Sequence, residues 1–473
     1  MAVRTRRSVF SLGDWGPELD WYGRAVDALR AKPLSDPTGW RYMAAVHGRM
    51  TGTDPYATPI DVVPGNSKTY WDQCQHQTWF FLPWHRGYLG AFEANIASTI
   101  VSLGGPPDWA LPYWNYSAGA SDRILPKDFY EPQRPDGSPN PLWVPWGRPS
   151  DGDAQLSDAD VSLNCLTHGV FAGTNNGGDP GFGGPVTGFM HFGQLVQLPS
   201  GWLEDAPHNA VHGALGGLMG NPDYAALDPI FWLHHCNIDR LWEVWRQLFP
   251  IAGDPNTAAW LHNVVFDMHD GAGAPFQFNS GEMLDTTTVM HGYDYDNVLP
   301  PPGPAPGPAV EAATPRIGMA ELAGANEERV SLKGGDVTTN LLVRTPSQRL
   351  TSTLEASQPL RAYLNLEQIK GDGMPGNYEA YVRKPGGQEF PAGLVTTFGI
   401  ERASRSDDGH GGNGLTRVLD ITSLIDELDL RTGEPTNLAV RLRKVVRPQA
   451  GEQPPYDTSG DTVTIGRVSV YFS

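Results

Sequence analysis

The chain has few cysteines, fewer basic than acidic residues, and no long apolar run. Three cysteines in 473 residues, Cys74, Cys165 and Cys236, are too few for a disulfide framework. Lys and Arg number 34 against 53 Asp and Glu, and the net charge of −19 argues against nucleic acid or an anionic membrane surface as partner, because both would repel it. No stretch approaches the roughly 20 apolar residues that span a bilayer. We therefore expect a soluble protein.

The first residues do not predict an export signal. Arg6 and Arg7 could begin a twin-arginine signal, but residues 8–15 contain no apolar run after them. The sequence therefore predicts a protein that stays in the cytoplasm rather than a secreted one. A homo-oligomer is compatible with the sequence.

The composition is that of a large globular protein with many loops. Hydrophobic residues make up 40% of the chain and aromatic residues 10%, which is enough for large cores in two or three packed units. The 55 glycines and 42 prolines predict many loops and few long helices.

Residues 228–242 predict a buried helix that carries a metal ligand. Asp228 can cap the first turn, and Pro229 suits the first helical position because its missing N–H costs nothing there. Four side chains then share one stripe at helical spacing: Phe231, His235, Asp239 and Trp242. A core helix with one polar spot is the alternative for this stretch taken alone.

Two upstream stretches place further histidines beside predicted helices. His47 ends a predicted helix at residues 40–48, His76 lies on a loop, and His85 follows Pro83 in the next helix. Desolvation by Trp, Phe and Leu neighbours should keep such imidazoles neutral and able to bind a metal. Capping or core packing is the alternative for each of them.

A third stretch places two histidines on one helical face. His208 and His212 follow Pro207 at i and i+4. With His235 they make a second set of three imidazoles, which suits copper, zinc, iron or nickel. Three neutral ligands leave one coordination position open for catalysis. Because a tri-histidine zinc hydrolase needs only one set, two sets indicate a pair of ions.

Four segments together resemble type 3 dinuclear copper proteins, which are tyrosinases, polyphenol (catechol) oxidases and molluscan haemocyanins. These segments are residues 74–76, 81–86, 208–212 and 228–242, and the likeness covers roughly residues 1–300. The resemblance implies a mainly α catalytic domain in which a four-helix bundle presents the ligands inward. It also implies two ligand sets: His47, His76 and His85 for copper A, and His208, His212 and His235 for copper B.

The resemblance gives roles to the neighbours of these ligands. Cys74 has the spacing at which fungal tyrosinases and molluscan haemocyanins form a thioether to the histidine two residues later, here His76; a small buried thiol is the alternative. His234 is expected to support copper B without binding it. Phe231 is expected to pack on the ligand rings. Asp239 is expected to accept a hydrogen bond from a ligand ring or to pair with Arg86.

Glu204 and Asn209 occupy the positions at which similar enzymes hold a water that deprotonates incoming monophenols. A buried base with a hydrogen-bonding partner could generate the phenolate that copper binds. A capping glutamate beside a surface asparagine is the alternative. The loop with Met219 and Pro222 is expected at the substrate pocket, where Pro222 leaves the entrance free of a bulky side chain.

The chain is expected to divide into three segments. Residues 1–298 form the dinuclear copper domain, and residues 299–329 form a Pro- and Gly-rich linker. Residues 330–473 alternate apolar and polar side chains and predict a β-sandwich. A similar domain covers the copper site in latent plant and fungal enzymes, with one side chain inserted. Met374 is the candidate for such a plug, and an exposed turn is the alternative.

The resemblance implies an oxidoreductase with two copper ions and O₂ as co-substrate. We expect it to hydroxylate monophenols in the ortho position and to oxidise o-diphenols to o-quinones, so that its partners are small phenolic substrates. One alternative is an enzyme limited to catechols or o-aminophenols. The other is a haemocyanin-like oxygen carrier, against which the lack of internal repeats argues.

Overall fold

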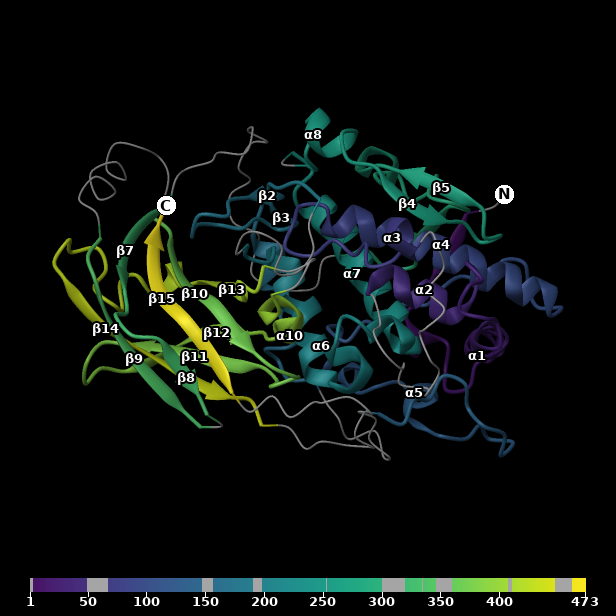
Figure 1. Ribbon diagram of the computed structural model, residues 1–473, viewed down its shortest axis with the longest axis horizontal. Helices are drawn as coiled ribbons and strands as arrows, with labels where there is room; N and C mark the ends of the chain where they lie inside the picture. Colours follow the sequence, from purple (N-terminus) through teal and green to yellow (C-terminus); the bar gives the residue numbers. More distant parts are fainter. Residues whose placement is uncertain are drawn as a thin grey trace.

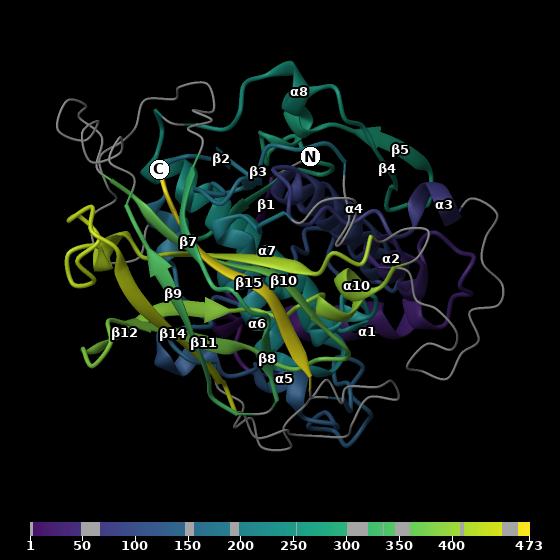
Figure 2. The ribbon, with the colours of Figure 1, turned by 60° about the vertical axis from the view of Figure 1, so that its left-hand side comes forward.

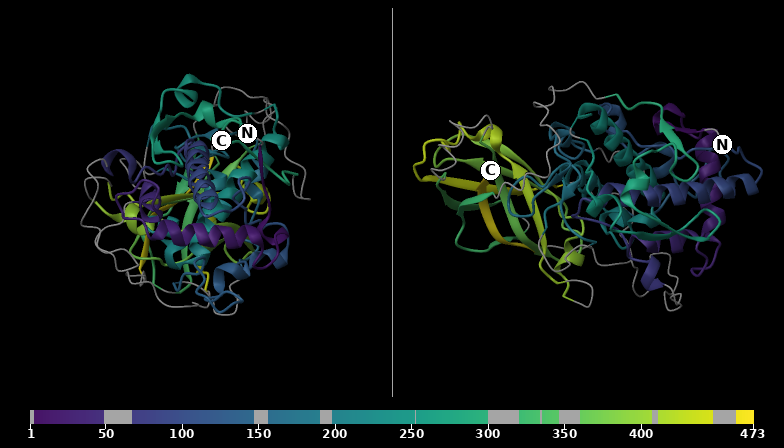
Figure 3. Two further views of the ribbon diagram at one scale, coloured as in Figure 1. Left: turned by 90° about the vertical axis from the view of Figure 1, so that its right-hand side faces the viewer. Right: turned by 90° about the horizontal axis from the view of Figure 1, so that it is seen from above.

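The computed structural model describes residues 3–48, 67–146, 156–189, 198–251, 253–299, 320–333, 335–345, 360–406, 411–446 and 462–473. Over these ranges the chain forms a mainly helical part and a β-rich part that lies beside it (Figure 1). Seen from above, the two parts lie end to end (Figure 3). None of the helices in the described ranges has the length and apolar character needed to cross a membrane.

The helical part combines three long helices with several short ones. Its helices are α1 (Pro17–Arg30), α2 (Trp40–His47), α3 (Ser67–Tyr70), α4 (Phe81–Ser102), α5 (Lys127–Tyr130), α6 (Ala210–Leu215), α7 (Pro229–Leu248) and α8 (Ala258–Leu261). Three two-stranded sheets complete it: β1 (Arg4–Arg6) with β6 (Tyr293–Tyr295), β2 (Ala172–Gly173) with β3 (Gly184–Pro185), and β4 (Phe266–His269) with β5 (Pro275–Phe278).

Helices α4 and α7 form the centre of the helical part. Residues 81–97 of α4 are all buried, as expected for a helix with no face toward solvent. Phe92 of α4 stacks on Trp232 of α7 with ring centroids 3.5 Å apart. Arg86 of α4 donates a hydrogen bond to Asp239 of α7 at 2.6 Å. The two helices that carry His85 and His235 are therefore held together by both apolar and ionic contacts.

Local signals in the sequence set the ends of two helices as predicted. Asp228 caps α7 by accepting a hydrogen bond from the N–H of Ile230, and Pro229 takes the first helical position. Helix α2 ends at His47, before Gly48.

The stretch before α6 contains an interruption that the sequence analysis did not predict. Residues Glu204–Asn209 form a wide π-type turn, in which Ala206 has non-helical backbone angles of φ −144° and ψ 128°. Pro207 causes the interruption, because it has no N–H to donate and restricts the residue before it. His208 and His212 nevertheless lie in consecutive turns after the interruption and converge.

The β-rich part consists of two antiparallel sheets around one hydrophobic core. Among the described residues, one sheet has five strands: β7 (Glu321–Ala325), β8 (Val330–Leu332), β10 (Ala362–Gly371), β13 (Leu415–Asp420) and β15 (Val463–Phe472). The other has four: β9 (Val337–Val343), β11 (Tyr378–Arg383), β12 (Glu389–Val395) and β14 (Thr436–Lys444). The short helix α10 (Ile400–Ser404) lies on the side that faces the helical part (Figures 1 and 2).

A helical part followed by a β-rich part agrees with the sequence analysis, whereas the four-helix bundle and the β-sandwich stay predictions. The division at residues 298 and 330 also stays a prediction, with one difference. Strand β7 lies within the expected linker, residues 299–329, and pairs with β15 from Glu321↔Phe472 to Ala325↔Ser469. Residues 300–319 of that linker lie outside the described residues.

Candidate metal centre

Two buried clusters of potential metal ligands lie in the helical part. The first contains His47 at the end of α2, Cys74 and His76 from the loop before α4, and His85 from α4 itself. The second contains His208, His212, His234 and His235, from the wide turn, α6 and α7. Within each cluster, the ligand atoms all lie within 4.8 Å of one another.

The two clusters form a single site because their rings touch. The ring centroids of His85 and His235 are 4.5 Å apart and the rings are nearly parallel, at 11°. The rings of His76 in the first cluster and His208 in the second also lie close together, with centroids 5.7 Å apart. Residues from distant parts of the sequence therefore meet in one buried pocket.

Backbone and side-chain carbonyl groups orient four of the rings. The Nδ1 atoms of His85 and His212 each lie 2.7 Å from a backbone oxygen, those of Phe81 and Met219, and His47 Nδ1 lies 3.0 Å from the oxygen of Pro222. His208 Nδ1 lies 3.0 Å from Oδ1 of Asn209. A carbonyl oxygen can only accept, so each Nδ1 carries the proton and each Nε2 keeps its lone pair.

The Nε2 atoms of the second cluster converge. Nε2 of His235 lies 3.3 Å from Nε2 of His208 and 3.5 Å from Nε2 of His212. Nε2 of His47 is buried and has no hydrogen-bond partner among the described residues. Ring nitrogens that converge at these distances can bind a cation between them, and neutral imidazoles are suitable ligands for copper. The donor set therefore fits a pair of copper ions.

Burial keeps the imidazoles neutral. It lowers the pKa of His85 and His212 to about 3 and that of His47, His208 and His235 well below the usual range. Neighbouring histidines lower the pKa values of His47, His85, His208 and His235 further, and the hydrogen bond from His47 to Pro222 acts in the opposite direction. At neutral pH the rings can therefore bind a metal without first losing a proton.

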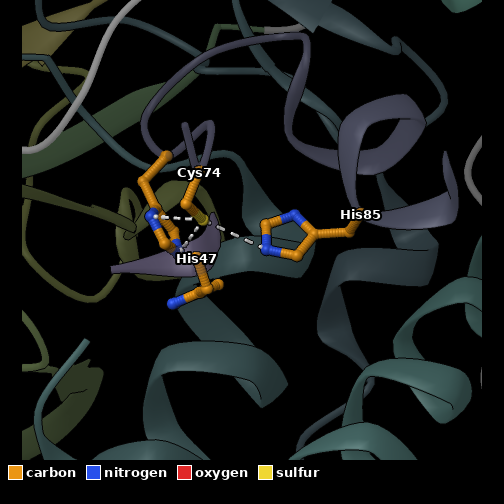
Figure 4. Close-up of side chains that lie close together, drawn as sticks. His47, Cys74 and His85 are labelled. Atoms are coloured by element: carbon orange, nitrogen blue, oxygen red, sulfur yellow. Dashed lines mark hydrogen bonds between the residues drawn. The ribbon is translucent and has the colours of Figure 1, made fainter. Parts of the chain in front are cut away.

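Cys74 lies against the edge of the His76 ring. Its Sγ atom is 3.2 Å from Nδ1 and 3.5 Å from Nε2 of His76, and the ring carbon between these nitrogens is Cε1. Sγ also lies 3.3 Å from Nε2 of His85 (Figure 4). Burial raises the pKa of the Cys74 thiol well above its usual range, so the sulfur is protonated in the metal-free protein.

Glu204 and Asn209 are both fully buried beside the histidines, so neither is a surface residue. Both carboxylate oxygens of Glu204 accept from the backbone N–H of Gln77 at 2.9 Å. Burial raises the pKa of Glu204 to about 8, despite this hydrogen bond. Asn209 accepts from His208 and donates from Nδ2 to Ser200 Oγ at 3.2 Å.

The neighbours of His235 on α7 have distinct contacts. Phe231 packs on the rings of His235 and His47, with centroid distances of 4.2 and 4.9 Å. Neither ring nitrogen of His234 has a hydrogen-bond partner among the described residues. The centroid of the His234 ring lies 4.8 Å from that of His212, so both adjacent histidines are near the site. The expectation that His235 is the ligand rests on its Nε2 atom, which converges with those of His208 and His212.

Asp239 takes the second of the two roles considered for it. It accepts from Arg86 at 2.6 Å and from the hydroxyl groups of Tyr293 and Tyr295, each at 2.6 Å. Arg6 of β1 contributes a further ion pair at 3.3 Å. The carboxylate thus anchors α7 to α4 and to the β1–β6 sheet.

The residues expected at the pocket lie close to the histidines. Met219 and Pro222 contribute backbone oxygens that orient His212 and His47. Met374, the expected plug, packs with its sulfur against Gly220. Phe398 instead reaches the imidazoles, because it stacks on His212 with centroids 4.1 Å apart at 16°.

Phe398 was missed because its role depends on how the two parts pack together. It lies between β12 and α10, 186 residues after His212, and is followed by Gly399, whose φ of +80° turns the chain sharply. A bulky apolar residue directly before such a glycine was the one available signal. Phe398 is also 5.8 Å from the ring of His208 and 6.0 Å from that of His76.

Two sets of buried imidazoles on a helical core, facing each other across one pocket, define a type 3 dinuclear copper protein. A model described as the common central domain of tyrosinase matches residues 37–248, and a model described as a domain of unknown function matches residues 319–473. The chain is 34% identical to a tyrosinase from Hahella sp. (strain CCB-MM4), with 99% of each chain covered. The chain belongs to the tyrosinase family.

More distant relatives share this architecture. The chloroplastic polyphenol oxidase B of Solanum lycopersicum is 28% identical over 64% of this chain and 50% of that protein, so the chain spans half of its length. The structure of latent apple tyrosinase has a TM-score of 0.61 at 20% identity, with 100% of this chain and 98% of that one covered. Deoxygenated haemocyanin from Rapana thomasiana has a TM-score of 0.51 at 15% identity, with 100% of both chains covered. These two structures bear on the fold alone.

Proposed function

We propose that the protein hydroxylates monophenols in the ortho position and oxidises the resulting o-diphenols to o-quinones, with O₂ reduced to water. His47, His76 and His85 would hold one copper ion, and the other would be held by His208, His212 and His235. The converging Nε2 atoms of His208, His212 and His235, at 3.3 and 3.5 Å, carry the proposal. The bound metals supply the binding and reduction of O₂.

The protein supplies a base and an orienting amide. A phenol has a pKa of about 10 and is mostly protonated at neutral pH, so its hydroxyl proton must be removed. Glu204 is the proposed acceptor of that proton through a water that Asn209 helps to hold. Its burial and its raised pKa of about 8 favour proton transfer near neutral pH.

The β-rich part is proposed to keep this site closed. Phe398 places a phenyl ring flat against His212. A phenolic substrate of similar size and flatness would occupy the same place, which supports both the substrate class and the role of Phe398 as the plug. Phe231 packs beside the ligand rings from within the helical part and would help to exclude water.

The proposed function can be tested with tyramine and catechol. The copper-loaded full-length chain and its Phe398→Ala variant should contain two copper ions per chain, and the variant should turn over both compounds. Asn209→Ala in the Phe398→Ala background should reduce tyramine hydroxylation by about a hundredfold and catechol oxidation much less, because general-base assistance is worth about that factor. Equal losses, at unchanged copper content, would rule out the assigned role of Asn209.

The same assays separate the alternative functions. Oxidation of catechol alone would indicate a diphenol or o-aminophenol oxidase. Reversible O₂ binding without turnover of either compound would indicate an oxygen carrier.

Hydroxylation should increase with pH, relative to catechol oxidation. Only the ionised carboxylate of Glu204 can accept a proton, and burial favours its neutral form, so the competent fraction increases as the pH rises toward about 8. Bound copper ions oppose this shift, and the inflection is expected no higher than about pH 8. The ratio of tyramine to catechol turnover between pH 5 and 8.5 provides the measurement, with Glu204→Gln as the variant that should abolish the increase. A pH-independent ratio in the parent protein would contradict the proposal.

We expect a thioether between Cys74 Sγ and Cε1 of His76 after copper loading under O₂. Bond formation removes two hydrogen atoms, one from the thiol and one from the ring carbon, with O₂ as the oxidant. Mass spectrometry of the peptide that contains both residues should therefore show a loss of about 2 Da, and Cys74 should become unreactive toward a thiol reagent after denaturation. Cys74→Ser provides the control. An unchanged mass and a reactive thiol in fully copper-loaded protein would contradict the crosslink.

A further inference from the structure

A buried arginine of the β-rich part reaches toward the proposed base. Arg417 lies on β13 and is 0% exposed. Its Nε atom lies 3.2 Å from Oδ1 of Asp205 and donates to the backbone oxygen of Thr396 at 2.9 Å. Its Nη1 atom donates to Ser200 Oγ at 3.4 Å. The guanidinium of one part of the molecule is therefore buried against two residues of the other.

From Ser200 the contacts continue into the metal centre. Ser200 Oγ accepts from Nδ2 of Asn209 at 3.2 Å, and Oδ1 of Asn209 accepts from Nδ1 of His208 at 3.0 Å. Arg417 and His208 are thus the two ends of a continuous chain of hydrogen bonds that runs through Ser200 and Asn209. This chain and a hydrogen bond between Asn209 and Asp205 together hold the amide of Asn209.

Arg417 also supplies positive charge to a buried acidic pair. Glu204 and Asp205 are adjacent, and burial raises the pKa of both, while the charge of Arg417 acts against that increase for each. A buried carboxylate that loses its partner is strongly destabilised, so the pair depends on this cation. Nη2 of Arg417 lies 3.5 Å from the backbone oxygen of Phe398, which links the same side chain to the proposed plug.

We propose that Arg417 is a positioning residue for monophenol hydroxylation, acting through Ser200 to hold Asn209 and, through Asn209, the ring of His208. This inference rests on the proposed function and deepens it: the β-rich part covers the site and also completes it. Two consequences follow. Removing Phe398 alone should open the site with hydroxylation intact, whereas loss of Arg417 should leave an enzyme biased toward o-diphenols.

The test compares variants in the copper-loaded, full-length Phe398→Ala protein. Arg417→Gln is expected to lower the ratio of tyramine to catechol turnover about tenfold, and Arg417→Lys to restore part of it. Arg417→Gln should also weaken the binding of one of the two copper ions about tenfold in a chelator titration, because residues that orient a metal ligand change the metal affinity by about this factor. The titration does not depend on turnover.

Two further variants separate positioning from simple attachment of the two parts. Arg361→Gln is the matched control: Arg361 also belongs to the β-rich part and pairs across the boundary, with Asp179 at 3.6 Å, but it donates nothing to Ser200 in the described structure. It should leave the ratio and the copper affinity unchanged. Ser200→Ala removes the contact through Ser200 and keeps both the Arg417–Asp205 pair and the hydrogen bond between Asp205 and Asn209. It should lower the tyramine-to-catechol ratio and the copper affinity in the same direction as Arg417→Gln, and it provides the test if Arg417→Gln does not fold.

Equal effects of Arg417→Gln and Arg361→Gln, or no effect of Ser200→Ala, would overturn the inference. If the Phe398→Ala parent hydroxylates no tyramine, the proposed monophenol activity fails. The copper titration then still decides whether Arg417 and Ser200 support His208.

Discussion

His235→Ala is expected to hold one copper ion per chain instead of two and to lose turnover of both tyramine and catechol by about a thousandfold or more. Nε2 of His235 contacts Nε2 of both His208 and His212, so the substitution removes one of the three nitrogens that converge on the proposed ion. Both reactions need the complete pair of ions, and groups that act as a unit fail together. Copper analysis after dialysis, followed by the two assays, provides the measurement.

The adjacent histidine supplies a matched control. His234→Ala should keep two copper ions, bound about 10- to 100-fold more weakly, because its ring packs on His212 and supports the site from outside. If His234→Ala loses an ion and His235→Ala keeps both, the assignment of the pair is reversed.

Phe398→Ala is expected to raise kcat/KM of the full-length chain for catechol about tenfold or more. The ring lies 4.1 Å from that of His212, where a substrate must approach, so its removal opens the pocket without removing any proposed ligand. A tenfold increase corresponds to a closed state favoured by about 1.4 kcal/mol. Steady-state kinetics on protein of equal copper content provides the measurement, and a melting curve establishes that the β-rich part stays folded.

Met374→Ala is the matched control for this variant. Met374 also belongs to the β-rich part, but its sulfur lies against Gly220. Its replacement should leave turnover unchanged. Activation by Met374→Ala and none by Phe398→Ala would restore the plug that the sequence suggested.

The features predicted correctly from the sequence depend on local signals. Helix α7 begins where Asp228 can cap it, and a cap is set by residues within one turn. The histidines that meet in the pocket were identified because each lies in a stretch with helical spacing or beside one. The interruption within residues 204–209 was not predicted: Ala206 has non-helical backbone angles, whereas the predicted helical spacing of His208 and His212 applies after Pro207.

Contacts between distant segments could not be predicted in this way. Arg6 attracted attention only as part of a possible export signal. In the structure it is buried, and it contacts Glu93 and Asp239 and lies over the ring of Tyr293. Phe398 and Arg417 likewise gain their roles from the packing of one part on the other, which no periodic pattern of apolar residues encodes.

The position of Phe398 makes the proposed closure a form of tethered competition. A phenyl group attached to the same chain is present at a fixed effective concentration, in the millimolar range for flexible tethers, however dilute the enzyme is. Inhibition of this kind is insensitive to dilution and raises KM while leaving kcat unchanged. A phenol that binds the pocket tightly would therefore displace the ring unaided, and a weak one would need the tether to be cut or moved.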